Sequence, residues 1–459
     1  MNALFRMNIT LLLVLGAAAL GAETPADWPA GYWRGTLQAG EQELEIVYRL
    51  EMDADGAWAG SMDVPAQGAS GLPLQSVEIS GDSIMITMPM AGDARFRGRW
   101  TAAEERVEGR FSQAGQSFPM VLKRAERGEA GPVRPQEPKP PLPYRSESVR
   151  FSNLGTTLAG TVTLPGDDGR HAGVVLVSGA GPQDRDGTFM NHRPLLVMAD
   201  HLTRAGFAVL RFDERGVGES EGDFATATAG QLAGDIAAAA DFLRGHDSVD
   251  RGQVGIIAHS EGGRLSALAI ENQQAADALV LLGAPALPGI AGLNAQAAQS
   301  PIAALQLAVA EASLRLEPGA NPEPAMRAAA EQLLAGLAED QLAAFGGNES
   351  LIVNQLVQAL GQPQTQFTLS FDPRPALRSA GIPVLALYGS KDRQVDVAGA
   401  AEALRDALGD RGDVRTLGGL NHFFQEAESG APSEYATIEQ TISPVALTAV
   451  AEWLRSNAQ

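Results

Sequence analysis

The stretch that decides the fold of this chain is Val254-Gly255-Ile256-Ile257-Ala258-His259-Ser260-Glu261-Gly262-Gly263-Arg264. Its first half is an apolar run typical of a strand buried on both faces, and its second half is a small-residue turn that opens a helix. The pattern A-x-S-x-G, from Ala258 to Gly262, differs at one position from G-x-S-x-G, the sharp turn that exposes a nucleophilic serine. We therefore expect Ser260 to be a nucleophile at a strand–turn–helix junction, rather than only a helix cap.

A serine hydroxyl needs a base, and the base needs a carboxylate that orients it. In chains with this turn the order is serine, then acid, then histidine. Of the six histidines only His422 follows Ser260, and it lies in a glycine-containing loop after the last candidate strand. Asp392 comes just after the preceding buried apolar run, whereas Asp396 is an alternative acid whose simpler role is to cap a helix. The sequence predicts a catalytic triad of Ser260, Asp392 and His422.

The loop Ser178–Gly187 follows another buried apolar run and is rich in glycine. Attack on a carbonyl needs two backbone N–H groups that bind the developing oxyanion. We expect one from Glu261, directly after the nucleophile, and the other from Ala180, with Gly179 permitting the turn.

Two charged stretches are interpreted as structural. Asp184-Arg185-Asp186 is expected to brace its loop through an ion pair. The glycine-rich turn 213–220 is expected to border the site, and it lacks the Lys-Ser/Thr ending of a phosphate loop.

The region from about residue 146 to the C-terminus alternates short apolar runs with helical stretches, which predicts a mostly parallel sheet with helices on both faces. The runs are 174–177, 208–212, 254–257, 278–282 and 384–387, and 149–163 reads as an antiparallel hairpin. Between about residues 287 and 372 the alternation stops and amphipathic helices such as Ala325–Leu337 and Glu349–Leu360 appear. This stretch is expected to be an inserted helical lid.

The N-terminal part is organised differently. Residues 24–125 contain short alternating stretches separated by turns, which predict an antiparallel β-barrel or sandwich domain. Residues 126–145 are dense in proline and are expected to form a semi-rigid linker.

The composition and the first residues limit the partners and the cellular location that we expect for the protein. A net charge of −21 argues against a nucleic-acid partner, and the absence of cysteine excludes disulfides and a thiol nucleophile. Arg6, the apolar run Ile9–Leu20 and the small residues after it predict a cleavable signal peptide at residues 1–22, with a permanent anchor as the alternative. We expect a periplasmic or secreted protein with no membrane span after cleavage. No cofactor or metal site is expected, and the oligomeric state stays open.

Four segments together resemble the α/β-hydrolase superfamily, and more narrowly the EstD-type carboxylesterases and the serine aminopeptidase-like hydrolases. They are S-G-A-G-P-Q-D-R-D-G, F-D-E-R-G-V-G-E-S, A-H-S-E-G-G and Y-G-S-K-D-R-Q-V, in that order. The resemblance covers about residues 146–457, departs from the group's G-H-S-E-G-G at Ala258, and implies the α/β-hydrolase fold. By position it implies the same triad, an oxyanion site at Gly179–Ala180 and a metal-independent esterase.

The expected activity is hydrolysis of a small-molecule carboxylic ester through an acyl-enzyme. One alternative is a serine peptidase or amidase of the same fold, in which Glu261 or acidic lid residues anchor a substrate amine. Another is a non-catalytic binding protein with a degenerate hydrolase fold, whose function lies in the β-rich domain.

Overall fold

The chain forms two compact units that divide between Ala130 and Gly131. The computed structural model describes residues 29–39, 42–52, 56–64, 69–88, 94–101, 104–113, 116–125, 134–297, 300–316, 320–342 and 349–457. The predicted signal peptide and the first residues of the predicted β-rich domain lie outside these ranges.

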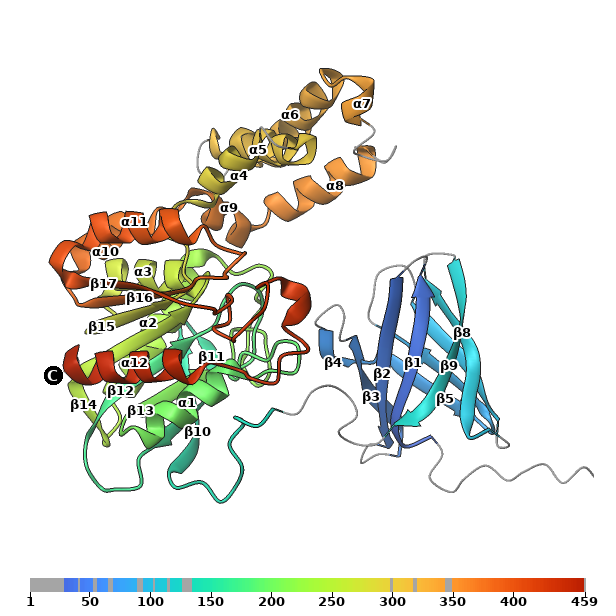
Figure 1. The fold of residues 1–459 in the computed structure, drawn as a ribbon, viewed down its shortest axis with the longest axis horizontal. Helices are drawn as coiled ribbons and strands as arrows, with labels where there is room; N and C mark the ends of the chain where they lie inside the picture. The colour runs from blue at the N-terminus through green and yellow to red at the C-terminus, as the bar shows by residue number, and fades with distance from the viewer. Residues whose placement is uncertain are drawn as a thin grey trace, which may run out of the picture. The chain divides into compact units, whose positions relative to one another are not determined.

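The first unit is one antiparallel sheet of nine strands in the order β4-β3-β2-β1-β9-β8-β7-β6-β5 (Figure 1). The sheet curls, so that β3, next to one edge of the sheet, contacts β5, the strand at the opposite edge. Its concave face encloses a core that includes Trp33, Tyr48 and Phe96. The predicted β-rich domain is thus a single curled sheet, not a two-sheet sandwich. Its strands are β1 Gly31–Ala39, β2 Gln42–Met52, β3 Trp58–Val64, β4 Ala69–Pro73, β5 Ser76–Ser80, β6 Ser83–Thr87, β7 Arg95–Thr101, β8 Arg106–Gln113 and β9 Gln116–Ala125.

The second unit contains an eight-stranded sheet in the order β10-β11-β13-β12-β14-β15-β16-β17. The hairpin β10–β11 pairs antiparallel with β13, and the remaining pairs are parallel. Because parallel strands end at the same edge, the loops after β12 to β17 gather at one side of the sheet. The strands are β10 Arg145–Asn153, β11 Thr156–Leu164, β12 His171–Val177, β13 Ala208–Phe212, β14 Val249–His259, β15 Ala278–Leu282, β16 Val384–Gly389 and β17 Gly412–Leu417.

Helices cover both faces of this sheet (Figure 1). One face packs against α1 Pro194–Arg204 and α12 Pro444–Asn457. The other packs against α2 Ala229–Arg244, α3 Gly262–Gln273, α10 Pro373–Ala380 and α11 Val397–Leu408. Short 3-10 turns occur at η3 Gly409–Arg411 and η4 Pro432–Glu434. The predicted α/β-hydrolase architecture is confirmed.

The insertion between β15 and β16 is helical, as expected for the lid, and projects from the sheet in Figure 1. It has a small apolar core of its own, which includes Leu305, Met326 and Val353. Its helices are α4 Gly289–Ala297, α5 Pro301–Leu314, α6 Glu323–Ala335, α7 Glu339–Leu342, α8 Glu349–Leu360 and α9 Pro363–Ser370. Among the described residues, no helix has the length and hydrophobicity required to span a membrane.

The proline-rich segment predicted as a linker does not stand apart from the second unit throughout its length. Residues 126–133 lie outside the described ranges. From Arg134 onward the segment packs against the second unit, where Arg134 itself is buried.

Candidate active site

Ser260 lies between β14 and α3 and has a φ of 51°, a left-handed conformation that costs an L-residue energy. Its backbone N–H donates to the Leu282 carbonyl at 2.8 Å, which ties the turn to β15. Glycine is sterically required at the last position of the motif, because a Cβ on Gly262 would lie 2.1 Å from the Ser178 carbonyl oxygen. Ala258 is buried within β14 and precedes the turn, so a methyl group is accommodated where related motifs carry glycine.

The strain at this turn predicts a difference between two variants that both remove the Ser260 hydroxyl. Ser260→Gly should be more stable than Ser260→Ala by about 1 kcal/mol, because glycine adopts positive φ without a Cβ clash. Urea unfolding of the two proteins measures this difference. Equal stabilities would show that the turn relaxes and stores no strain.

The structure brings Asp392 and His422 into direct contact. His422 Nδ1 lies 2.7 Å from Asp392 Oδ2, and the two side chains are 2% and 0% exposed. Asp392 Oδ1 accepts the backbone N–H groups of Gln394 and Val395 at 2.8 and 3.1 Å. The carboxylate is therefore oriented with one oxygen toward the imidazole. Asp396, the alternative acid, instead caps α11 by accepting the N–H of Gly399.

Ser260 is connected to this pair through Gly283. A Cβ on Gly283 would lie 3.2 Å from His422 Nδ1 and 3.5 Å from Asp392 Oδ2. Gly283 directly follows Leu282, whose carbonyl binds Ser260. The predicted triad residues thus follow β14, β16 and β17, and the turn after β15, at Leu282 and Gly283, contacts Ser260 on one side and the Asp392–His422 pair on the other.

The predicted oxyanion residues lie beside Ser260. A Cβ on Gly179 would lie 3.4 Å from Ser260 Cβ, so the loop after β12 passes close to the nucleophile. Within the described part of the chain, no hydrogen bond uses the backbone N–H of Ala180 or Glu261. Both groups thus remain available to a developing oxyanion.

The charged stretches brace the loop Ser178–Gly187, which we call the oxyanion loop. Its ion pairs are not the ones expected. Arg185 pairs with Asp213, its Nη2 lying 2.5 Å from Oδ2 and its own backbone N–H 2.7 Å from Oδ1. Asp186 pairs with Arg211. Asp184 accepts the N–H of Asp186 instead of a guanidinium. The brace therefore joins the loop to the turn that follows β13.

Glu214 is a site residue for which sequence patterning assigned no individual role. Its carboxyl accepts the Ser178 hydroxyl at 2.5 Å and the Gln183 N–H at 3.1 Å, so it holds the oxyanion loop at two points. Burial raises the pKa of Glu214 to about 8, which leaves it largely protonated at pH 7. In that form its O–H donates to Ser178 while its carbonyl oxygen still accepts from Gln183.

Glutamine at position 214 mimics the protonated acid and provides a pH test. With a pKa raised from its ordinary 4.5 to about 8, the folded wild type binds more protons than the unfolded chain between these values. Its stability therefore falls as pH rises through this window. From pH 5 to pH 8.5 the Tm of the wild type should drop by at least ~3 °C more than that of Glu214→Gln. Parallel Tm profiles would contradict this.

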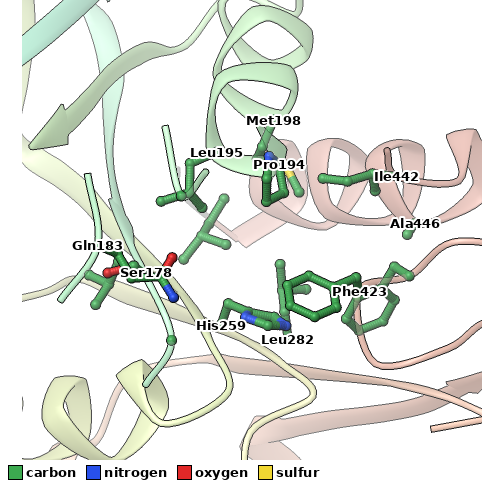
Figure 2. Close-up of a pocket in the computed structure, with 15 residues that line it drawn as sticks. Ser178, Gln183, Pro194, Leu195, Met198, His259, Leu282, Phe423, Ile442 and Ala446 are labelled. Carbon is green, nitrogen blue, oxygen red and sulfur yellow. The ribbon is translucent and has the colours of Figure 1, made fainter. Parts of the chain in front are cut away.

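His259 is a second unassigned residue, next to the nucleophile. Its Nε2–H donates to the His422 carbonyl oxygen at 3.1 Å, and its ring packs at 4.8 Å from the His422 ring and 5.0 Å from Phe423. Burial, together with the nearby His422, lowers the pKa of His259 to about 3, so it stays neutral at physiological pH. Figure 2 shows His259 beside Phe423 at a cavity of about 40 Å³ whose wall includes Leu195 and Met198.

A larger cavity of about 400 Å³ lies between the lid and the loops and helices that follow β12, β13 and β14. It reaches Ala180 and Glu261 and is bounded by the lid helix α9. Its wall is mostly apolar and includes Phe224, Leu232, Leu265 and Phe367. The described residues contain no group of three or more His, Asp and Glu side chains able to hold a metal ion.

The carboxylate of Glu261 has two partners at this cavity. One oxygen lies 2.5 Å from Arg264 Nη1, and the other accepts the hydroxyl of Thr368 on α9 at 2.7 Å. Its charge is therefore neutralised within the protein. The Thr368 bond also links the lid to the residue that follows Ser260.

Known proteins that are similar to the second unit are serine hydrolases and esterases. The family described as "Serine aminopeptidase, S33" matches residues 194–426, just over half of the chain. The esterase EstD of Thermotoga maritima is 30% identical over 131 residues, which is 28% of this chain and 31% of EstD. The match therefore spans less than a third of that relative's length.

The chain is also similar to solved structures of esterases. A Pyrococcus furiosus esterase is 15% identical with a TM-score of 0.42, covering 72% of this chain and 98% of its own. Est1E from Butyrivibrio proteoclasticus, solved with ferulic acid, is 17% identical with a TM-score of 0.42, covering 67% and 98%.

Proposed function

The chain belongs to the serine aminopeptidase S33 family of α/β hydrolases, and we propose that it is a serine esterase that cleaves small carboxylic esters. The observation that carries this proposal is the buried hydrogen bond between Asp392 and His422, beside a serine held in a strained turn.

The proposed reaction follows from the roles of these groups. Asp392 accepts the Nδ1–H of His422, so Nε2 is free to take the proton of Ser260. The Ser260 oxygen attacks the ester carbonyl, and the N–H groups of Glu261 and Ala180 bind the oxyanion. His422 then protonates the leaving alcohol, and a water molecule activated in the same way releases the acid. His259 stays neutral throughout, so no second imidazolium forms beside His422.

The lid cavity favours an ester over a peptide with a free amine. Recognition of an ammonium group needs an uncompensated carboxylate. The acids that line the cavity are Glu214 and Glu261. Burial raises the pKa of Glu214 to about 8, and Glu261 is paired with Arg264. Neither offers a free negative charge at neutral pH, whereas the apolar wall suits an uncharged acyl or alcohol group.

A fluorophosphonate probe and a substrate pair test the proposal. The probe should label the wild type and fail to label Ser260→Ala. For p-nitrophenyl esters kcat/KM should exceed that for aminoacyl p-nitroanilides by at least ~100-fold. Faster cleavage of the anilides would indicate a peptidase, and failure of the wild type to react with the probe or any ester would indicate a binding protein.

We also propose that the protein is exported, to the periplasm or the medium. This rests on the basic residue and apolar run of residues 1–22. N-terminal sequencing of the mature protein from a cell fraction tests it, because a retained Met1 in the cytoplasm would contradict export.

A further inference from the structure

The proline-rich segment that enters the second unit carries a buried arginine. Arg134 is 9% exposed, and its guanidinium donates to four backbone carbonyls. Two belong to Asn191 and Met190, at 3.1 and 3.0 Å, and two to Ala436 and Ile438, the former at 2.9 Å. One side chain thus joins three separate parts of the sequence. Replacing it leaves buried carbonyls without a donor.

Gln136 makes a second set of bonds to the same region. Its Oε1 accepts the N–H groups of Thr441 and Ile442 at 2.6 and 3.1 Å, and its Nε2 donates to the Ile442 carbonyl at 2.6 Å. The side-chain amide therefore pairs with the backbone as a neighbouring strand would. Arg134 and Gln136 together hold residues 436–442, and we call them the clasp.

The segment held by the clasp is bonded to the loop of His422. His192 bonds the Tyr435 carbonyl and the Thr441 hydroxyl, both at 3.0 Å. Its Nε2 also lies 2.9 Å from Nε2 of Gln425, which donates to the carbonyl of Gln440 at 3.0 Å. Burial lowers the pKa of His192 to about 4, so this network is uncharged at neutral pH.

Gln425 continues the network to the residue next to His422. Asn421 Nδ2 donates to Gln425 Oε1 at 2.8 Å, and Asn421 Oδ1 accepts the N–H groups of Phe423 and Gln425. Both Asn421 and Gln425 are fully buried. The loop also contains Phe424 at a φ of 60°, a conformation that persists only when its surroundings hold it.

We propose that Arg134 and Gln136, at the start of the second unit, are positioning residues that hold the loop carrying His422 in its reactive geometry. This rests on the proposed function, in which His422 is the base. Because small displacements of a base cost much of the rate, the clasp acts on turnover more than on substrate binding. Residues 134–136, which precede β10, are then part of the esterase machinery and not only a tether for the β-rich unit.

Arg134→Ala in the full chain tests the clasp. Arg145→Ala is a matched control, because the Arg145 side chain is exposed and its one ion pair with a described residue is a 3.8 Å contact with Glu147. Arg134→Ala should lower kcat for a p-nitrophenyl ester ~10–100-fold while KM changes less than ~3-fold. Arg134→Lys, which keeps the charge but forms fewer bonds, should recover part of the loss. If Arg134→Ala does not fold, Gln136→Ala, which removes only the Thr441 and Ile442 bonds, replaces it.

Hydrogen exchange separates failure of the clasp from failure of the proposed function. In Arg134→Ala, peptides covering residues 420–443 should exchange at least ~10-fold faster than in the wild type, with β12 to β16 unchanged. This readout does not depend on any activity. Wild-type kcat together with unchanged exchange would overturn the clasp, and so would equal acceleration across the whole unit. A wild type that neither hydrolyses esters nor reacts with the fluorophosphonate would overturn the proposed function instead.

Discussion

Ser260→Ala is expected to lower kcat for p-nitrophenyl ester hydrolysis by ~10⁶-fold, close to the rate of a protein without a nucleophile. Loss of the hydroxyl removes the atom that forms the acyl-enzyme, and no neighbouring group replaces it. The variant should keep its fold, because the Ser260 bond to Leu282 uses the backbone N–H. Steady-state kinetics with an unfolding curve on the same preparation measure both effects.

Ser266→Ala is the matched control for this result. Ser266 lies on α3, less than two turns from the nucleophile, and is buried with no hydrogen-bond partner for its hydroxyl among the described residues. Its loss should leave kcat unchanged within ~2-fold and leave stability equal or slightly higher. Residual activity above ~1% in Ser260→Ala would remove Ser260 from the proposed mechanism.

Asp392→Asn has the second largest expected effect, a ~10⁴-fold loss of kcat. Asp392 Oδ1 accepts two backbone N–H groups, so the amide oxygen of asparagine must take that place. Its NH₂ group then faces His422 Nδ1 and donates to it. The imidazole is forced into the tautomer with a proton on Nε2, which cannot accept the proton of Ser260.

The control for this change is Asp396→Asn. Asp396 caps α11, and asparagine caps a helix about as well as aspartate, so both kcat and Tm should stay near the wild type. Similar losses in both variants would point to a general electrostatic effect instead of a specific acid. Determining kcat against pH for Asp392→Asn adds a check, since a wrong tautomer lowers the plateau at all pH values.

The local sequence pattern was sufficient to predict strands and lid helices of the second unit. The strands Ala208–Phe212 and Ala278–Leu282 and the helix Glu349–Leu360 have the bounds expected from their apolar runs and periodicity. Strands buried on both faces carry a strong signal, because nearly all of their residues are apolar. The sequence also identified the candidates for nucleophile, acid and base, since chain order and the ends of the predicted strands restrict each role to one or two residues.

The sequence pattern determined less of the architecture of the β-rich unit. Alternation shows which face of each strand is buried, but a barrel and a sandwich satisfy that pattern equally well. The structure shows one curled sheet with β4 and β5 at its edges. The strand order depends on pairings between strands distant in sequence, such as β1 with β9.

The amino-acid sequence by itself therefore determined the layered fold of the second unit, the strained serine turn and the identity of the candidate reacting residues, because each depends on short-range pattern. Only the tertiary structure decided which partners surround them. It paired Arg185 with Asp213 and not with its neighbours, placed Glu214 under the oxyanion loop, and bonded Arg134 to backbone carbonyls some 300 residues away. The physical reason is that side-chain partners and pKa values depend on burial and on which loops meet at the sheet edge. Neither is encoded within any single segment.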